Sequence, residues 1–412
     1  MSQPKVIVLG GCGVVGTACT RTLANDDTFK EVIIGDIDLD KAEKLAEQLG
    51  EKVSAVKVDA NDKESIRSAI KGTDMVVNCV GPYYKFEKII LPVVIEEKIN
   101  YVDVNDDTGA TYDALDMDEA AKEAGITALI GMGSSPGVTN LLAHYAATDL
   151  LGECDSIDMF HTHGGEPSEG PGVIGHRFYC MSNPVPVFLD GEEKLVDPMD
   201  SESLEEDVEF INLEGKYHVY PYPHPEPITM PKYIEDIKRV TNKGNVLPEE
   251  YYELTRNVFA AGLDSKEPVN VKGTQITPYD FAISYLIQER EKILEETNFG
   301  KAKGCVKIVV KGRKKRTNEE RTYIFSLVSE GVGEGKGLGE GTGTPAAFGA
   351  ILVQQGKVDA KGVIPPEGGV NAMDFLQLMR TTYKIGKGDE ESKSPLIFES
   401  IDGEGNVKRM EF

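Results

Sequence analysis

A glycine-rich loop near the start of the chain has the spacing needed to hold phosphate groups. The sequence GCGVVG at residues 11–16 directly follows the apolar run Val6–Leu9 and precedes a helical pattern. Glycines in such a turn let backbone N–H groups approach a pyrophosphate, whose charge the helix dipole also favours. We therefore predict a dinucleotide-binding loop. Its expected contacts are Gly11, Gly13, Val14, Val15 and Gly16.

Asp36 is the residue expected to select the cofactor, because it ends the second apolar run, 20 residues after Gly16. A carboxylate at this place accepts hydrogen bonds from ribose hydroxyls and repels a 2′-phosphate, so NAD is predicted and NADP is less favoured. Asp59 ends the third run. It is a candidate for contact with the adenine edge or, alternatively, for helix capping together with Asn61 and Asp62.

Two further segments are expected near the nicotinamide, because the carboxyl ends of parallel strands form the cofactor crevice. Val80 and Gly81, after the fourth apolar run, are predicted to line the nicotinamide ribose. The fifth run ends in the carboxylates Asp103, Asp106 and Asp107. Such a cluster suits an ammonium group, and close carboxylates raise one another's pKa, which favours Asp103 and Asp107 as general bases. The alternative is that these carboxylates serve as loop and N-cap residues before the next helix.

More candidates for substrate contact come from the following turn and from the middle of the chain. Ser135 as N-cap and Pro136 as first helical residue would leave N–H groups that hold a carboxylate or carboxamide. His163 flanks a glycine-rich loop and is a candidate catalytic group, and two arginines are candidate carboxylate clamps. No metal is expected, because His161 and His163 lack a third ligand at fixed spacing. The predicted substrate-binding residues are Tyr83, Ser134, Ser135, Asn140, His176, Arg177 and Arg239.

Strands and helices must alternate to position these residues, and the first 130 residues show that alternation. Apolar runs of strand length separated by helical patterns predict an α/β fold, a Rossmann domain with a doubly wound parallel sheet. The predicted strands are Lys5–Leu9, Glu31–Gly35, Val53–Val58, Met75–Cys79, Tyr101–Val104 and Thr127–Ile130, and the clearest helices are Asp40–Leu49, Phe86–Lys98 and Tyr112–Ala124.

The rest of the chain predicts a second, mixed α+β domain with an antiparallel sheet. A hairpin of Cys305–Lys311 with Arg321–Val328 is expected, with the basic cluster Arg313–Arg316 at its tip. Thr344 and Pro345 have the pattern of an N-cap and first helical residue. The expected divisions are a dinucleotide domain (1–130), a catalytic domain (131–340), a helical segment (341–385) and a peripheral tail (386–412).

Composition excludes several classes of partner. With 412 residues the chain is long enough for two domains, and its net charge of −25 opposes binding to nucleic acid or anionic lipid. The start lacks a basic, apolar leader and no apolar run approaches about 18 residues, so a soluble cytoplasmic protein is expected. The six cysteines show no CxxC pair and are expected to be reduced.

Several motifs together resemble the saccharopine dehydrogenase-like family, the group of saccharopine reductase, lysine epsilon-dehydrogenase and carboxynorspermidine dehydrogenase. The resemblance implies a Rossmann domain, a catalytic α/β domain, a late helix that returns to the first domain, and a homodimer. It also implies hydride transfer between a nicotinamide and a carbon bonded to nitrogen in a small amino acid or amine, as in lysine metabolism. Beyond the glycine loop, the motifs are Gly81–Tyr83, Tyr101–Asp103, Gly133–Asn140, Thr342–Ala347 and Gly362–Glu367.

Two other functions stay open at this point. Related enoyl reductases, which reduce a carbon–carbon double bond, also contain a Gly-Pro-Tyr turn like that at residues 81–83. A sensor that binds NAD(H) without turnover would need the same glycine loop. The carboxylates after the fifth run favour an amine substrate, because an acyl chain would require an apolar loop there.

Overall fold

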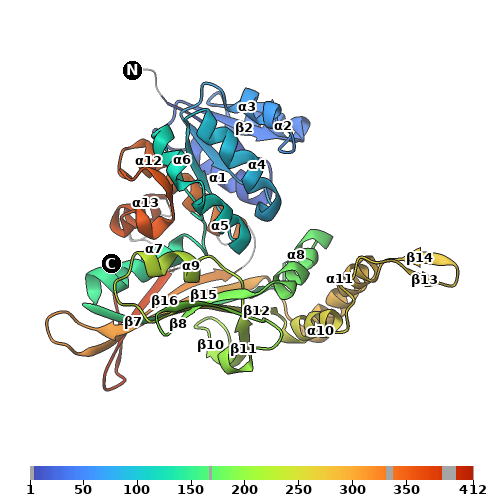
Figure 1. The fold of residues 1–412 in the computed structure, drawn as a ribbon, viewed down its shortest axis with the longest axis vertical. Helices are drawn as coiled ribbons and strands as arrows, with labels where there is room; N and C mark the ends of the chain where they lie inside the picture. The colour runs from blue at the N-terminus through green and yellow to red at the C-terminus, as the bar shows by residue number, and fades with distance from the viewer. Residues whose placement is uncertain (1–3, 167–168, 331–336, 383–395, 412) are drawn as a thin grey trace. The chain divides into compact units, whose positions relative to one another are not determined.

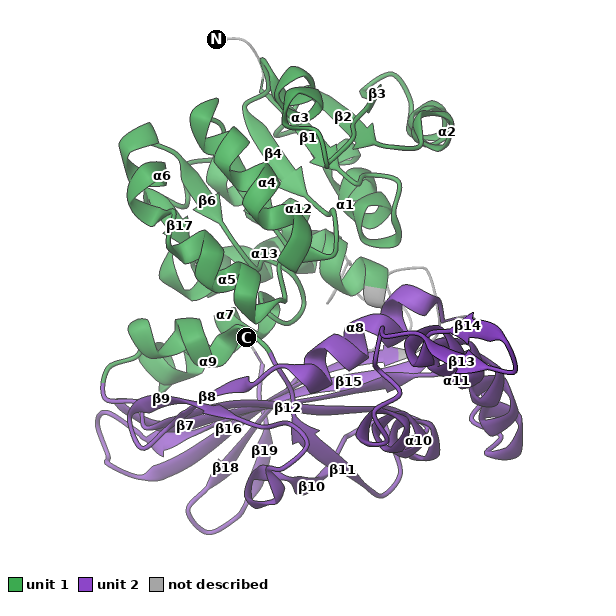
Figure 2. Cartoon of the chain, turned by 45° about the vertical axis from the view of Figure 1, so that its right-hand side comes forward, with its two compact units in different colours: residues 1–151, 224–235, 333–394 green, residues 152–223, 236–332, 395–412 purple. Residues whose placement is uncertain are grey.

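The chain folds into two compact units, which Figure 2 colours separately. The structure is a computed structural model that describes residues 4–166, 169–330, 337–382 and 396–411. Unit 1 combines residues 1–151 with 224–235 and 333–394, and unit 2 contains residues 152–223, 236–332 and 395–412. The observed divisions differ from the predicted ones because three separate stretches of chain form unit 1.

Unit 1 contains a parallel sheet with seven strands in the order β17-β6-β5-β4-β1-β2-β3. This topology confirms the doubly wound α/β fold expected from the sequence. The seventh strand, β17, adds a late segment of the chain beside β6. The strands are β1 (Lys5–Leu9), β2 (Glu31–Asp36), β3 (Val53–Lys57), β4 (Met75–Asn78), β5 (Asn100–Asp103), β6 (Thr127–Leu129) and β17 (Gly362–Ile364).

Helices cover both faces of this sheet, since successive residues of a strand point to opposite sides. Tyr101 and Ala128 pack in a core with α3, α4, α5 and α6. Their neighbours Val102 and Leu129 lie on the other face, close to Gly349 of α12. The helices of unit 1 are α1 (Val14–Ala24), α2 (Leu39–Leu49), α3 (Lys63–Ile70), α4 (Tyr83–Glu96), α5 (Thr108–Leu115), α6 (Asp118–Ala124), α7 (Val138–Tyr145), α9 (Glu226–Thr229), α12 (Leu338–Gln354) and α13 (Ala372–Thr382), with a π-helical turn at Ala146–Leu150 and 3₁₀ turns at Met230–Lys232 and Pro366–Gly368.

The late helix α12 packs directly on α1, as the family resemblance implied. Gly343 makes this close contact possible, because a Cβ there would lie 2.2 Å from the carbonyl oxygen of Val15. The helix begins at Leu338, so the prediction that Thr344 and Pro345 start it was wrong. Packing against α1 stabilises the extra turns in spite of the internal proline. The single helix predicted over Tyr112–Ala124 is likewise two helices, α5 and α6.

Unit 2 contains a ten-stranded mixed sheet, with α8, α10 and α11 in the same unit (Figure 1). Strands β7 and β12 are parallel and the other pairs of this sheet are antiparallel. The strands are β7 (Glu153–Gly164), β8 (Val185–Leu189), β9 (Glu192–Val196), β10 (Glu206–Glu209), β11 (Lys216–Pro221), β12 (Arg239–Leu247), β15 (Lys303–Arg313), β16 (Glu320–Glu330), β18 (Leu396–Asp402) and β19 (Val407–Arg409). The other elements are the separate hairpin β13 (Val269–Val271) and β14 (Thr274–Ile276), α8 (Pro171–Ser182), α10 (Glu249–Ala260), α11 (Pro278–Glu296) and a 3₁₀ turn at Glu202–Leu204.

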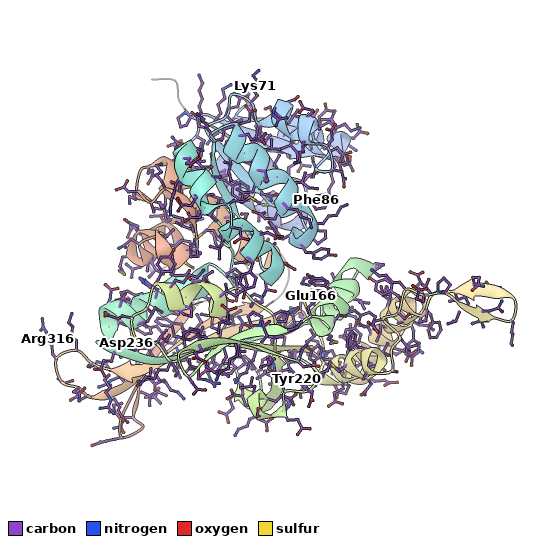
Figure 3. All side chains as sticks on the ribbon, viewed as in Figure 1. Lys71, Phe86, Glu166, Tyr220, Asp236 and Arg316 are labelled. Carbon is purple, nitrogen blue, oxygen red and sulfur yellow. The ribbon has the colours of Figure 1, made fainter. Side chains whose placement is uncertain are left out.

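The end of the chain belongs to this sheet. Residues 396–402 form β18, which pairs with β16 over seven positions from Arg321↔Asp402 to Leu327↔Leu396. The sequence predicted a peripheral tail after residue 385, and the structure differs because backbone pairing with a distant strand outweighs a charged local composition. Residues 383–395 lie outside the described part. The predicted β15–β16 hairpin is present, and Arg316 lies in its turn (Figure 3).

None of the described helices combines the length and the apolar composition that a membrane-spanning helix needs.

Candidate functional site

The glycine loop between β1 and α1 has a backbone that only glycine permits. A Cβ on Gly16 would lie 2.1 Å from the carbonyl oxygen of Gly10, and one on Gly11 would lie 2.8 Å from that of Val8. Gly13 is the N-cap of α1 and offers no side chain to bond the first N–H groups. These N–H groups could therefore hold a pyrophosphate, and that role of the loop stays a prediction. Val14, at the start of the helix, is 81% exposed.

Asp36 lies at the end of β2 beside this loop. Its Oδ2 accepts a hydrogen bond of 3.2 Å from the N–H of Cys12, and its Oδ1 accepts one of 3.1 Å from the N–H of Asp38. The carboxylate is thereby held at the place where a dinucleotide's adenosine ribose lies in such folds. Asp59 accepts two hydrogen bonds from Asn61, whereas Asp62 is the residue that caps α3.

Two buried side chains support the loop after β4: Asn78, and Tyr83, which the sequence predicted to bind substrate. The Tyr83 hydroxyl donates to the carbonyl oxygen of Asn78 at 2.8 Å, and Tyr83 is buried. The side-chain oxygen of Asn78 accepts from the N–H of Val80 at 3.0 Å. Val80 is partly exposed and Gly81 is exposed. Tyr83 therefore supports the loop that presents Val80 and Gly81.

The two predicted bases, Asp103 and Asp107, are both engaged in holding backbone. Asp103 is completely buried, and its Oδ1 accepts from the N–H groups of Gly131 at 2.6 Å and Asn105 at 2.9 Å. Asp107 caps α5 by accepting from the N–H of Ala110 at 2.8 Å. The capping interpretation of Asp107, left open by the sequence, is the one that the structure shows.

The turn after β6 binds an acidic side chain from a distant segment. The Ser135 hydroxyl donates to Oε1 of Glu226 at 2.6 Å, and the Thr139 hydroxyl donates to the same oxygen at 3.1 Å. Helix α7 begins at Val138 with Gly137 as N-cap, so the prediction that Ser135 and Pro136 start the helix was wrong. The difference arises because the Ser135 hydroxyl bonds Glu226 and not the helix backbone.

Glu226 also holds a histidine. Its Oε2 lies 3.1 Å from Nδ1 of His224, and both side chains are buried. Burial raises the pKa of Glu226, but His224 and the Ser135 hydroxyl outweigh it and lower the pKa to about 2. Burial lowers the pKa of His224, and the charge of Glu226 outweighs it and raises that pKa. His224 and Glu226 thus form an ion pair that favours a protonated imidazole at neutral pH.

A second buried carboxyl stands beside this pair. Oε2 of Glu367 accepts a hydrogen bond of 2.8 Å from the side-chain amide of Asn140. Burial raises the pKa of Glu367 to about 7, and the charge of Glu226 adds to the shift. Asn140 also lines a pocket between the loops after β5, β6 and β17, together with Asn105 and Thr229. Unit 1 therefore gathers titratable and polar groups at the carboxyl edge of its sheet.

Four of the predicted residues lie in unit 2, and all four have partners there. Arg177 is buried and paired with Glu169, and Nε of Arg239 donates to Asp158 at 2.8 Å. Nε2 of His176 lies 3.5 Å from Sγ of Cys180.

His163, the fourth, ends β7. Its Nδ1 lies 3.6 Å from Glu166, which is labelled in Figure 3. Ser134 lies in unit 1, partly exposed. Within the described ranges, no group of three His, Cys, Asp or Glu side chains could hold a metal ion.

The chain is similar to a known protein family and to several characterised enzymes. Residues 6–129 match the family model of the saccharopine dehydrogenase NADP binding domain. The chain is 24% identical to carboxyaminopropylagmatine dehydrogenase of Synechocystis sp., over 88% of this chain and 92% of that protein. It is 25% identical to carboxynorspermidine synthase of Vibrio alginolyticus, over 91% of this chain and 94% of that protein. The chain is thus similar to a saccharopine dehydrogenase domain over residues 6–129 and to these two enzymes over most of its length.

A solved structure shows the same fold over nearly the whole chain. Saccharopine dehydrogenase (L-Glu forming) of Saccharomyces cerevisiae superposes with a TM-score of 0.66 at 18% identity, covering 92% of this chain and 98% of that one. The comparisons confirm the family resemblance inferred from the sequence motifs. They also confirm the two-part architecture of a Rossmann-like sheet followed by a mixed sheet.

Sequence reasoning missed His224, Glu226 and Glu367. The signal that could have found the first two is the run Pro223-His224-Pro225-Glu226-Pro227, in which prolines restrict the backbone around two titratable residues. No local pattern assigns this run to unit 1, because the segments before and after it belong to unit 2.

Proposed function

We propose that this chain is an NAD(P)-dependent oxidoreductase that transfers hydride between a nicotinamide and a carbon bonded to nitrogen in a small amine or amino acid. The observation behind this proposal is that one edge of one parallel sheet holds both the glycine loop and the His224–Glu226 pair. A dinucleotide in such a fold lies along that edge, so its reactive ring and a proton-transferring group fall on the same side.

The chain's own residues supply binding and proton transfer. The glycine loop would hold the pyrophosphate, Asp36 the adenosine ribose, and Val80 and Gly81 the nicotinamide ribose. The nicotinamide supplies the hydride chemistry when it is bound. In the direction of imine reduction, His224 donates a proton to the substrate nitrogen; in amine oxidation it takes that proton back. Glu226 stabilises the protonated imidazole and fixes its orientation.

His224 replaces Asp103 and Asp107 as the proposed proton-transferring group. Both aspartates accept hydrogen bonds from backbone N–H groups, so proton uptake there would weaken the bonds that hold the loops. The relatives named above act on carboxylated polyamines or their agmatine analogue, which contain the carbon–nitrogen bond that the proposal requires. We therefore expect a substrate of that chemical class or an amino acid related to lysine.

The proposal is tested by following cofactor absorbance with a panel of substrates. NAD(P)H oxidation should be observed with one pairing of a semialdehyde and a diamine, agmatine or amino acid, or NAD(P)⁺ reduction with the corresponding secondary amine. Silence across the panel, with a cofactor that still binds tightly, would contradict the amine oxidoreductase and leave a cofactor-binding sensor. Turnover of an enoyl substrate alone would point to reduction of a carbon–carbon bond.

NAD is the cofactor that we propose, although the matching family model is named for NADP. Asp36 is the reason, because its carboxylate would repel a 2′-phosphate. We expect Asp36→Ser to shift the ratio of kcat/KM for NADP to that for NAD by about tenfold or more toward NADP. Asp40→Ser removes an equal charge from the first turn of α2 and should leave the ratio unchanged. An unchanged ratio in Asp36→Ser would contradict the choice of NAD.

Two predictions from the sequence concern the oligomeric state and the cellular location of the protein. A homodimer, which the family resemblance implies, and a cytoplasmic location stay predictions. Light scattering on the purified full chain would test the first of them.

A further inference from the structure

A cluster of buried polar side chains lies beneath the loops at the carboxyl edge of the unit 1 sheet. Glu87 of α4 is 1% exposed, and Asp103 of β5 is completely buried. Oε2 of Glu87 accepts from the Tyr101 hydroxyl at 2.9 Å, and this hydroxyl accepts from the Asn78 amide at 2.9 Å. The proposed reaction uses neither the Glu87 carboxyl nor this chain of hydrogen bonds.

One oxygen of each carboxyl has no partner that the structure shows. Among the described residues, buried Oε1 of Glu87 and buried Oδ2 of Asp103 each lack a hydrogen bond. The two carboxyl groups lie within hydrogen-bonding reach of each other. Two carboxylate oxygens cannot bond without a proton between them, and two adjacent buried anions are very unfavourable. A single proton would satisfy both oxygens and remove one of the charges.

We propose that Glu87 and Asp103 share one proton, with Glu87 as the neutral acid that donates from Oε1 to Oδ2 of Asp103. This pair joins α4 to the loops after β5 and β6, because Oδ1 of Asp103 binds the N–H groups of Asn105 and Gly131. Glu87 is thereby a positioning residue for the loops beside the proposed nicotinamide site. The shared proton itself does not depend on the proposed function, but its consequence for the reaction does.

The surroundings decide which of the two groups holds the proton. Asp103 receives two backbone N–H hydrogen bonds, which stabilise an anion. The Tyr101 hydroxyl interacts with both carboxyl groups and donates to Oε2 of Glu87, a carboxyl to which no backbone N–H of the described residues donates. Burial and the charge of Asp103 both raise the pKa of Glu87 well above its ordinary value. Burial raises the pKa of Asp103 to about 6, and the two N–H groups limit that rise. Tyr83 and Cys79 also face this cluster, and burial raises the pKa of the Tyr83 hydroxyl well above its ordinary value.

Two substitutions of Glu87 separate the proton from the shape of the side chain. In Glu87→Gln the amide N–H₂ donates to Asp103 and the amide oxygen accepts from Tyr101, so both hydrogen bonds persist without a titrating group. In Glu87→Leu the volume remains but both bonds are lost. We expect Glu87→Gln to keep the thermal midpoint and NADH affinity of the wild type, and Glu87→Leu to bind NADH about tenfold more weakly.

Infrared spectroscopy and a pH series test the proton directly. The wild-type protein should show carbonyl absorption from buried carboxylic acids at pH 7. Because burial also raises the pKa of Glu367 to about 7, the signal of the pair is the part that Glu87→Gln removes and Glu367→Gln retains. Because the pKa of Glu87 is raised in the folded state, wild-type stability should fall as pH rises above the ordinary value of 4.5, and this fall should be smaller in Glu87→Gln.

Three results would overturn the shared proton: no carboxylic acid band in the wild type, a band in Glu87→Gln that is unchanged from the wild type, or the same pH-dependent loss of stability in the wild type and in Glu87→Gln. None of these measurements depends on turnover, so failure of the proposed reaction would be seen separately in the substrate panel.

Discussion

Gly16→Ala is expected to abolish dinucleotide binding, with at least a hundredfold rise in the dissociation constant of NAD(H), which corresponds to about 2.8 kcal/mol. The added Cβ would lie 2.1 Å from the carbonyl oxygen of Gly10 and 2.8 Å from Cα of Gly11. Both atoms belong to the backbone of the loop, so the loop or the start of α1 must move. The N–H groups that would face the pyrophosphate then lose their alignment.

Fluorescence titration with NADH measures this effect, and two other glycine variants control for folding. Gly341→Ala lies in α12 with no atom within 4 Å of the new Cβ, so it should bind NADH like the wild type. Gly13→Ala meets only the Gly10 oxygen, at 3.3 Å, and should fold normally while its methyl group obstructs the pyrophosphate. Wild-type affinity in both Gly16→Ala and Gly13→Ala would show that the cofactor binds elsewhere.

His224→Gln is expected to lower kcat by about 10²- to 10³-fold with little change in cofactor affinity, since it removes a proton-transferring group from the proposed site. Glutamine retains a polar group near Glu226 but cannot exchange a proton at neutral pH. The wild-type rate should depend on a group whose pKa lies above the ordinary value of 6.5, in the direction that Glu226 produces. This limb of the pH profile should be absent from His224→Gln.

Steady-state kinetics on the substrate identified by the panel would measure the loss. Glu226→Gln should move the same limb toward lower pH, because it removes the charge that stabilises protonated His224. His218→Gln is a matched control, since His218 is also paired with carboxylates but lies exposed in unit 2. A normal rate and pH profile in His224→Gln would contradict the role of His224 and restore Asp103 and Asp107 as the candidates.

Local sequence patterns predicted the unit 1 sheet well because each of its first six strands is a short, largely apolar run with a helix after it. The predicted bounds of β1 agree with the structure, and those of β2 to β6 agree within one residue at each end. The helix starts at Ser135 and Thr344 were predicted incorrectly for one common reason. In each case a contact with a distant segment replaced the expected cap: Glu226 binds Ser135, and α1 packs against the longer α12.

The glycine loop shows what the sequence determined by itself. The loop follows one strand, and Asp36 ends the next strand. This pattern predicts a dinucleotide site from the sequence because it depends on neighbouring residues only. The tertiary structure alone decided which titratable groups stand beside that site. His224, Glu226 and Glu367 reach it from segments far along the chain, and Asp103 became a buried anchor through Glu87 and Gly131. Burial and pairing set the protonation of these groups, and both depend on contacts between residues that no local pattern brings together.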